Sequence, residues 1–322
     1  MIRALALFLF FASCSKPNCN SPSTELTSIT DAQKTGVELV VLGTIQDAGS
    51  PHIGCNKPCC INLSVAEAAV RQVSCLGIID YDNEHTYLLD ATPDLTSQVA
   101  NLHTQANWNI GKSPSGIFLT HAHIGHYTGL MYFGREALGG DRIKTYAMPR
   151  MVEFLSTNGP WNQLVKLENI ELHKLEQDEP VRLSDKLKIT PFSVPHRDEF
   201  SETVGFKIEG PQKSLLFIPD IDKWELWKRS ILDEIRKVDY AFLDASFYNT
   251  VELGHRDPTE IPHPLVEESM ALFDQLSEAN RSKIYFIHLN HTNPLLNTIS
   301  PEYAEMKRRG YQLAQFNSTV HL

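Results

Sequence analysis

The chain has 322 residues, of which 42% are hydrophobic and 21% charged, and its formal net charge is −10. These proportions are ordinary for a globular protein, and no run approaches the roughly 20 apolar residues that span a bilayer. The acidic balance argues against a nucleic-acid partner, which favours a basic face. A small-molecule substrate, even an anionic one, stays open because a bound metal ion can dominate the local field.

The first residues are typical of an export signal. Arg3 precedes a short apolar run that ends in Phe11-Ala12-Ser13-Cys14, which is similar to the lipobox of bacterial lipoproteins. We expect residues 1–13 to be a signal peptide, Cys14 to carry a lipid and residues 14–36 to be a flexible tether. A buried helix is the alternative, but no amphipathic pattern supports it. The protein is therefore expected in the cell envelope, exported or facing the periplasm, and bound to a membrane only through its lipid anchor.

One domain is expected over residues 37–322, because no composition break or low-complexity linker follows residue 36. Hydrophobic patterns predict strands at Val37–Gly43, Leu76–Tyr81, His85–Asp90, Gly116–Leu119, Ile143–Ala147, Leu187–Val194, Thr203–Glu209, Ser214–Ile218, Tyr240–Leu243 and Lys283–His288. Helical patterns lie at Asp94–Gln105, Met131–Leu138, Lys223–Lys237 and Pro264–Ser277. Adjacent strands with helices between them favour a layered α/β domain.

Cysteines gather soon after the first strand, in the segment Cys55-Asn56-Lys57-Pro58-Cys59-Cys60. Thiolates this close together suit a structural zinc ion, which takes four Cys or His ligands in a tetrahedron. Disulfides are the competing interpretation, since an exported protein permits them, and their partners would have to be Cys19 or Cys75. Cys75 lies in a strand-like run, where a small buried hydrophobic residue is more typical.

Three histidines lie within six residues, in Thr120-His121-Ala122-His123-Ile124-Gly125-His126. An apolar strand precedes them and an apolar, helix-like segment follows. Histidines at i and i+2 of an extended backbone point to the same side, and the third returns toward them as the chain turns. Neutral imidazole is the commonest metal ligand near neutral pH, and three imidazoles leave an open position for water. The spacing therefore predicts a metal site, with a histidine-rich surface loop as the alternative.

This segment resembles the H-x-H-x-D-H signature of the metallo-β-lactamase superfamily. The family's other metal-site motifs have candidates in the same order, each at the end of a predicted strand: Asp90, His196, Asp220 and His288. The resemblance covers nearly the whole chain after the signal, and ordered matches at strand ends are more specific than any single one. It implies an αββα sandwich of the α/β class, with a metal cleft at one end of the two sheets.

Within the superfamily, the chain resembles the family of coenzyme PQQ synthesis protein B. The segments that carry this resemblance are Val40–Thr44, Val194–Arg197, Leu243–Phe247 and His288–Pro294. The cysteine loop and the pair His288 and His291 are similar to those of the cyclic phosphodiesterase of bacterial phosphonate breakdown. Resemblance of fold does not settle the substrate.

The resemblance also implies metal ligands. A first metal would be held by His121, His123 and His196. A second would be surrounded by His126, Asp220 and His288, with Asp220 shared between the two. A structural zinc would be enclosed by Cys55, Cys59, Cys60 and His291. The active-site metal could be zinc, iron or manganese, and one or two such ions are expected.

Three residues are assigned catalytic roles through the same resemblance. Asp90 would orient the histidine loop, Asp220 would orient the nucleophile, and His263 would contact the substrate. Simpler alternatives exist for three of the residues singled out by the resemblance: His288 could be a satisfied core histidine, Asp220 a helix cap, and His263 an idle loop residue.

The chain departs from the family signature at Gly125, where aspartate, a ligand of the second metal, is usual. Glycine has no side chain to replace it, although Asp222, Asp198 or a water molecule could. We therefore expect the second position to be empty or partly filled, and Gly125→Asp to increase its occupancy if the backbone tolerates the side chain.

The leading functional hypothesis is a hydrolase in which metal-bound hydroxide attacks an ester or phosphodiester of a small-molecule substrate. The resemblance to PQQ protein B implies an alternative, oxidative tailoring of a cofactor precursor at iron. A third hypothesis is a lipoprotein that binds a metal or ligand without catalysis, having lost turnover with the aspartate at position 125.

Overall fold

The computed structural model describes residues 34–254, 256–257 and 260–322. The expected signal peptide and Cys14 lie outside this part of the chain, as does Cys19. Their assignments stay predictions. Within the described residues, no helix is both long enough and apolar enough to cross a bilayer.

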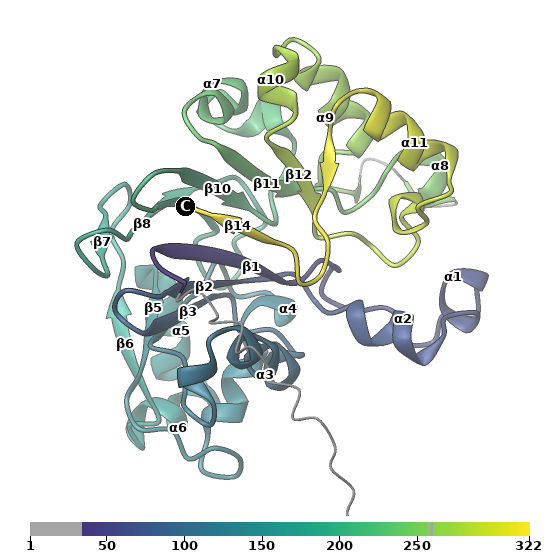
Figure 1. The fold of residues 1–322 in the computed structure, drawn as a ribbon. Coiled ribbons are helices and arrows are strands. Elements are labelled where there is room, and N and C mark those ends of the chain that lie inside the picture. Colours follow the sequence, from purple (N-terminus) through teal and green to yellow (C-terminus); the bar gives the residue numbers. More distant parts are fainter. Residues whose placement is uncertain (1–33, 255, 258–259) are drawn as a thin grey trace, which may run out of the picture. The chain divides into compact units, whose positions relative to one another are not determined.

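Two mixed sheets form the centre of the fold (Figure 1). The first has the order β14-β1-β2-β3-β4-β5-β6, with bounds Thr319–His321, Val37–Gly43, Cys75–Asp80, His85–Leu89, Gly116–Phe118, Ile143–Ala147 and Ile170–Lys174. The second has the order β13-β12-β11-β10-β9-β8-β7, with bounds Gln312–Leu313, Ile284–Ile287, Tyr240–Asp244, Ser214–Ile218, Val204–Glu209, Lys188–Ser193 and Val181–Arg182. Strands β3 to β6 are parallel to one another, as are β10 to β13.

Strand β10 shows how both sheet faces are buried. Successive side chains of a strand point to opposite faces. Leu215 and Phe217 lie in the core between the sheets, whereas Leu216 and Ile218 lie in the core beneath the helices of the second sheet. A strand covered on both faces needs an unbroken apolar sequence, which is why these segments lack polar alternation.

Helices cover the outer face of each sheet (Figure 1). On the first sheet, α3 (Leu95–Gln105), α5 (Pro149–Thr157) and α6 (Trp161–Lys166) bury apolar side chains against β1 and β4. On the second, α7 (Ile231–Arg236), α9 (Val266–Phe273) and α11 (Pro301–Arg308) do the same. The layers are therefore helix, sheet, sheet, helix. Residues 35–322 form one compact unit, and the predicted single-domain αββα sandwich is confirmed.

The remaining helices are short. The α-helices among them are α1 (Pro58–Ile61), α2 (Val65–Val70), α4 (Ile124–Tyr127), α8 (Thr250–Leu253) and α10 (Glu278–Arg281). The 3-10 helices are η1 (Asn107–Asn109), η2 (Thr128–Phe133), η3 (Trp224–Leu226) and η5 (Pro294–Leu296). Helix α1 carries Cys59 and Cys60 of the cysteine segment, α2 follows it, and α4 carries the last histidine of the triplet.

Two predicted helices are wrong. The helix expected at Met131–Leu138 is the end of η2 followed by turns, because Gly134 adopts an extended conformation (φ −65°, ψ 165°) that ends η2 at Phe133. The helix expected at Lys223–Lys237 is interrupted between η3 and α7. There Ser230 caps α7 by accepting a hydrogen bond from the N–H of Asp233 (3.3 Å), which starts a new helix rather than continuing the first.

The strands missed by the sequence analysis are the edge strands β6, β7, β13 and β14. Only Ile170 of the five residues in β6 is fully buried, so the apolar pattern that reveals the central strands is absent.

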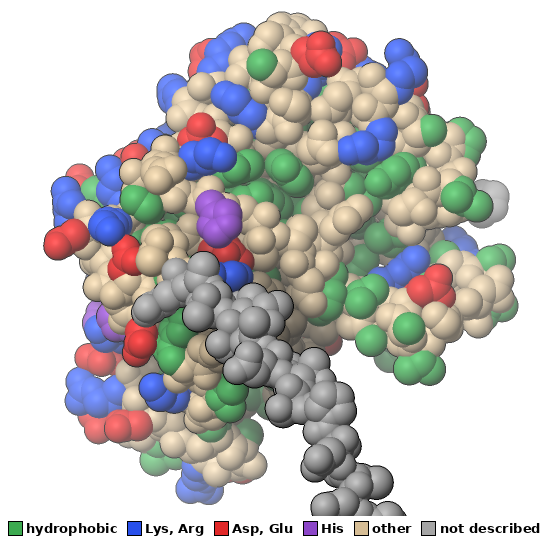
Figure 2. Space-filling view, in the orientation of Figure 1, with side chains coloured by type: hydrophobic (Ala, Val, Ile, Leu, Met, Phe, Trp, Pro, Cys, Tyr) green, Lys and Arg blue, Asp and Glu red, His purple; other side chains and the backbone are tan. Residues whose placement is uncertain are grey.

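On the face shown in Figure 2, acidic and basic side chains are interspersed without a continuous basic patch.

Candidate metal centre and active site

The predicted ligands of the cleft follow the carboxyl ends of strands from both sheets. Asp90 follows β3, the histidine triplet follows β4, His196 follows β8, Asp220 follows β10 and His288 follows β12. Strands β8 and β10 point the same way because each is antiparallel to β9. Since these carboxyl ends meet at one edge of the two sheets, the topology brings the side chains together.

A first cluster of four donor atoms lies at this edge. It contains His121, His123, His196 and Asp220, whose donor atoms all lie within 4.8 Å of one another. Nδ1 of His123 is 2.9 Å from Nε2 of His121 and 3.2 Å from Nε2 of His196. Oδ2 of Asp220 lies 3.3 Å from His121 Nε2 and 3.2 Å from His196 Nε2. Convergent nitrogens and one carboxylate form a donor set that suits a divalent transition metal.

The other ring nitrogens of these histidines are hydrogen-bonded to neighbouring side chains. Nδ1 of His196 lies 2.9 Å from Oδ1 of Asp222, and Nδ1 of His126 lies 2.8 Å from Oδ2 of Asp90. Asp90 also accepts hydrogen bonds from the backbone N–H and the hydroxyl of Thr120 (2.8 and 2.9 Å). Such contacts fix the orientation of a ligating imidazole and leave its second nitrogen toward the cleft. Asp90 thus lies where it would orient the histidine loop.

A second cluster contains a residue that the sequence analysis did not name, Asp47. Its Oδ1 lies 3.1 Å from Nε2 of His126 and 3.3 Å from Nε2 of His288. Oδ2 of Asp220 lies 3.9 Å from the same His126 nitrogen, so Asp220 stands between the two clusters. Asp47 follows β1 in a loop that carries no strand-end or histidine pattern, and a carboxylate there gives no signal in the sequence.

Two buried polar atoms of the cleft have no hydrogen-bond partner among the residues that the structure describes. They are Nε2 of His126 and Oδ1 of Asp220, on side chains that are 0% and 3% exposed. Most buried polar atoms in proteins are hydrogen-bonded, so each exception needs an explanation. Both atoms can donate a lone pair to a metal ion. The residues of the cleft therefore fit a bound metal.

The expected replacements for an aspartate at position 125 are not in place. The carboxylate of Asp222 faces His196, and that of Asp198 accepts a hydrogen bond from Thr203 (2.7 Å). The space beside Gly125 is instead occupied by Asp47, whose Cα would lie 2.6 Å from a Cβ at position 125. The expectation that Gly125→Asp increases metal occupancy is therefore corrected, because the new side chain would collide with Asp47.

His263 lies in the cleft and is held by carboxylates. Its Nδ1 is 2.8 Å from Oδ2 of Asp244 and 3.2 Å from Oδ1 of Asp220. Asp244 also accepts a hydrogen bond from the hydroxyl of Ser246 (2.8 Å), and this hydroxyl lies 2.9 Å from Nδ1 of His288. Asp244 and Ser246 were noted only as part of a resembling segment. The sequence signal that could have assigned Asp244 is the one that identified Asp220, a carboxylate at the end of an apolar strand.

Buried carboxylates and histidines of the cleft stabilise each other's charged forms, as their pKa values show. Burial alone would raise the pKa of Asp220, but His263 and His196 hold it well below its ordinary value. Burial would lower the pKa of His196 and His288, but neighbouring carboxylates raise these pKa values to about 9 and about 10. His121 differs, because burial and the nearby charge of His126 hold its pKa well below the ordinary value.

Left-handed backbone occurs at two of the strand ends. Asp90 has a φ of +73° and His288 a φ of +64°, although neither is a glycine. This conformation is uncommon for such residues and persists where surrounding contacts impose it, often at functional sites. At both positions it turns a strand end into the cleft, and both side chains are fully buried.

The cysteine cluster is a separate group of donors. Its members are Cys55, Cys59, Cys60 and His291, whose donor atoms all lie within 4.8 Å of one another. The four cysteines in the described part of the chain are free thiols, and Cys75 is fully buried in β2, as expected for a small hydrophobic residue. Burial and the nearby charges of His52 and Lys57 lower the pKa of His291 to about 4, so its imidazole is neutral near pH 7. Neutral imidazole and clustered thiols suit zinc.

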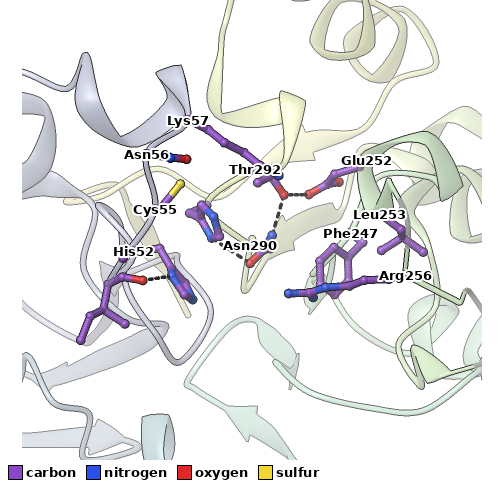
Figure 3. Close-up of a pocket in the computed structure, with 13 residues that line it drawn as sticks. His52, Cys55, Asn56, Lys57, Phe247, Glu252, Leu253, Arg256, Asn290 and Thr292 are labelled. Atoms are coloured by element: carbon purple, nitrogen blue, oxygen red, sulfur yellow. Dashed lines mark hydrogen bonds between the residues drawn. The ribbon is translucent and has the colours of Figure 1, made fainter.

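A pocket lies beside this cluster (Figure 3). His52, Cys55 and Lys57 line one side, and Phe247, Glu252 and Arg256 line the other. A chain of hydrogen bonds crosses its floor, from Asn290 to Thr292 (2.6 Å) and from Thr292 to Glu252 (2.5 Å). The Phe247 ring of this pocket lies 6.2 Å from the His263 ring of the cleft, centroid to centroid.

Known proteins of similar sequence are coenzyme PQQ synthesis proteins B. The protein from Xanthomonas axonopodis pv. citri (strain 306) is 26% identical over 302 residues, which cover 86% of this chain and 97% of the relative. The protein from Acinetobacter baylyi is 28% identical over 297 residues, covering 83% of this chain and 94% of the relative.

Solved structures share the fold. Zn²⁺-bound PqqB from Methylobacterium extorquens superposes with a TM-score of 0.71 at 22% identity, covering 88% of this chain and all of that one. A diphosphatase from the PhnP family superposes with a TM-score of 0.62 at 22% identity, covering 89% of this chain and 98% of that one. The family model described as the beta-lactamase superfamily domain matches residues 85–289, more than half of the chain. The chain therefore belongs to the beta-lactamase superfamily and is similar to PqqB within it.

Proposed function

We propose that the protein is a metal-dependent hydrolase that cleaves an ester or phosphodiester. The observation that carries this proposal is the convergence of the donor atoms of His121, His123, His196 and Asp220, all within 4.8 Å of one another. The unpartnered nitrogen of His126 and oxygen of Asp220 support it, because they mark where further bonds to a metal would form. Zinc is the favoured metal, since the PqqB structure of similar fold is Zn²⁺-bound.

His121, His123, His196 and Asp220 would hold the first metal. When bound, a divalent metal lowers the pKa of a coordinated water to about 7 and polarises a substrate oxygen. Asp220 would orient the attacking water through Oδ1, which has no hydrogen-bond partner of its own. Its depressed pKa keeps this carboxylate ionised near neutral pH, so it can accept a hydrogen bond from that water.

His263 would act on the leaving group. Its Nδ1 is committed to Asp244, which fixes the ring and leaves Nε2 as the nitrogen that can reach the substrate. The carboxylates of Asp244 and Asp220 raise the pKa of His263 despite its burial, which favours the protonated form of the ring. A positioned histidine of this kind acts as a general acid toward the departing oxygen.

A phosphodiester fits the surroundings better than a neutral ester. Lys57 and Arg256 lie in the pocket beside the cysteine cluster, where they would attract a negatively charged part of the substrate. The structural similarity to a diphosphatase favours attack at phosphorus over attack at a carboxylic ester.

The experiment is a panel of chromogenic substrates, bis-p-nitrophenyl phosphate and p-nitrophenyl acetate, assayed with Zn²⁺, Mn²⁺ and Fe²⁺. We expect turnover of the phosphodiester that stops on chelation and returns on adding metal. The matched control is His85→Ala, which removes a histidine at the exposed start of β3. Absence of turnover with every metal and both substrates would refute the hydrolase.

A second candidate, oxidative tailoring at iron, is favoured by the similarity to PqqB along most of the chain. It predicts oxygen uptake by the Fe²⁺-loaded protein and none by the Zn²⁺-loaded protein. An oxygen electrode separates the two candidates, because hydrolysis proceeds equally well without oxygen.

A further inference from the structure

We propose that Asp47 is the carboxylate ligand of the second metal position, in place of the side chain that Gly125 lacks. The inference rests on the proposed metal-dependent function and names a ligand for it. The second position would then be bounded by His126, His288, Asp47 and Asp220, two imidazoles and two carboxylates.

The donor atoms of this position face one another. Nδ1 of His126 is hydrogen-bonded to Oδ2 of Asp90, and Nδ1 of His288 is hydrogen-bonded to the hydroxyl of Ser246. Their Nε2 atoms are therefore the ones left for a ligand, and Asp47 Oδ1 lies 3.1 and 3.3 Å from them. The His126 nitrogen makes no hydrogen bond even with this oxygen beside it, so the direction between them is not that of an N–H bond. A shared cation satisfies both atoms without such alignment.

Charge favours the same conclusion. Asp47 brings a carboxylate to the side of the position lined by His126 and His288. With Asp220 it gives the position two negative charges. Low occupancy of the second metal position was expected because Gly125 supplies no carboxylate. The structure supplies a carboxylate there from a different loop, at Asp47.

Gly125 and Asp47 are linked through space. A Cβ at position 125 would meet Oδ1 of Asp47 and would lie 2.6 Å from both Cα and Cγ of Asp47. Rotation of the Asp47 side chain cannot relieve the contact with its own Cα. Gly125 is not among the glycines with positive φ, so its backbone does not require glycine. The reason for glycine is room for Asp47.

The loop that carries Asp47 is fixed to the strand end that carries His288. Gln46 N–H donates to the carbonyl of Leu289 (2.9 Å), and Leu289 N–H donates to the carbonyl of Thr44 (2.8 Å). Ile45, fully buried, pairs with Leu289 in an isolated bridge. Asp47 is therefore positioned by backbone hydrogen bonds, as a metal ligand must be.

The test measures metal content of the full-length protein after dialysis against Zn²⁺. We expect two zinc ions from the cleft and one from the cysteine cluster in the parent, and the loss of one in Asp47→Asn, which keeps the shape of the side chain. The matched control is Asp198→Asn, a carboxylate that faces Thr203 and should leave the metal content unchanged. Asp47→Asn protein that retains every zinc ion would overturn the proposal.

An exchange of the two residues tests the spatial link. Gly125→Asp alone should lower Tm and reduce the zinc content, because it collides with Asp47. Combined with Asp47→Gly, it should recover both, since the carboxylate then enters from position 125. If the double variant is no better than the sum of its single changes, the link is refuted. A parent with one cleft zinc but metal-dependent turnover would reject the role of Asp47 and leave the hydrolase standing.

Discussion

The cleft and the cysteine cluster both assemble metal-binding side chains, yet they are built in different ways. The cleft draws its residues from the ends of strands in both sheets, and its imidazoles are held by carboxylates or hydroxyls. The cysteine cluster takes three thiols from one short segment and a single imidazole from beyond β12. In the cleft, charged side chains surround the metal-binding atoms. In the cysteine cluster, the four ligands face one another.

This difference indicates different tasks. A catalytic metal keeps an open position, and the groups behind its ligands tune their basicity. A structural zinc has a complete set of four protein ligands and contributes to folding. In this chain a structural zinc would tie the segment after β1 to the segment after β12. Four changes test the comparison, from the largest expected effect to the smallest.

The largest effect is expected from His121→Ala. Loss of a ligand from the first cleft position should lower turnover of the phosphodiester by at least about 100-fold, since even the residues behind metal ligands contribute up to that factor. Metal analysis should show the cysteine-cluster zinc retained. If turnover is unchanged while the protein is folded, the cleft is not the catalytic centre.

His291→Ala should act mainly on folding. Removing the only imidazole of the cysteine cluster should release its zinc and destabilise the fold by roughly several kcal/mol, because metal binding at such sites is coupled to folding. The matched control is His52→Ala, whose ring lies 4.3 Å from the His291 ring but is not a member of the cluster.

Thermal unfolding and zinc release measure both variants. Counting free thiols in denatured, chelated protein checks the same cluster, and we expect Cys55, Cys59 and Cys60 to be reduced. A disulfide at any of them in protein from its native compartment would contradict the structural zinc.

Asp244→Asn should separate positioning from binding. This residue contacts His263 and, through Ser246, His288. We expect turnover to fall by about 10- to 100-fold with the metal content unchanged. The basic limb of the pH profile should move to lower pH, because His263 loses a charge that raises its pKa. An unaltered pH profile would show that Asp244 has no role in protonating the leaving group.

The smallest effect on the folded unit is expected from Cys14→Ser. We propose that Cys14 carries a lipid, so the change should move the protein from the membrane fraction to the soluble fraction. Its metal content and turnover should match the parent. Membrane association that survives the change would reject the lipid anchor.

Much of the cleft could be predicted because its residues carry local patterns. His121 and His123 alternate on extended chain, and Asp220 ends an apolar strand, so each is visible from its neighbours. The central strands were recognisable for the same reason, as in β1 and β10, which have the predicted bounds. The edge strand β6 is half-exposed and has no such pattern.

Asp47 and Gly125 could not be related from the sequence. Seventy-eight positions apart, they meet where the loop after β1 lies against α4. A glycine gives no indication of which atom occupies its space. The role of Asp244 was missed for a different reason. It ends an apolar strand and so shares the pattern that identified Asp220, but that pattern does not show that it contacts His263 and Ser246.

The central claim is that the cleft of the folded protein binds metal ions. Anomalous scattering from crystals of the Zn²⁺-loaded protein, recorded on either side of the zinc edge, tests this most directly. We predict peaks at the cysteine cluster, between His121, His123 and His196, and between His126, His288 and Asp47. A peak at the cysteine cluster with none in the cleft would contradict the account.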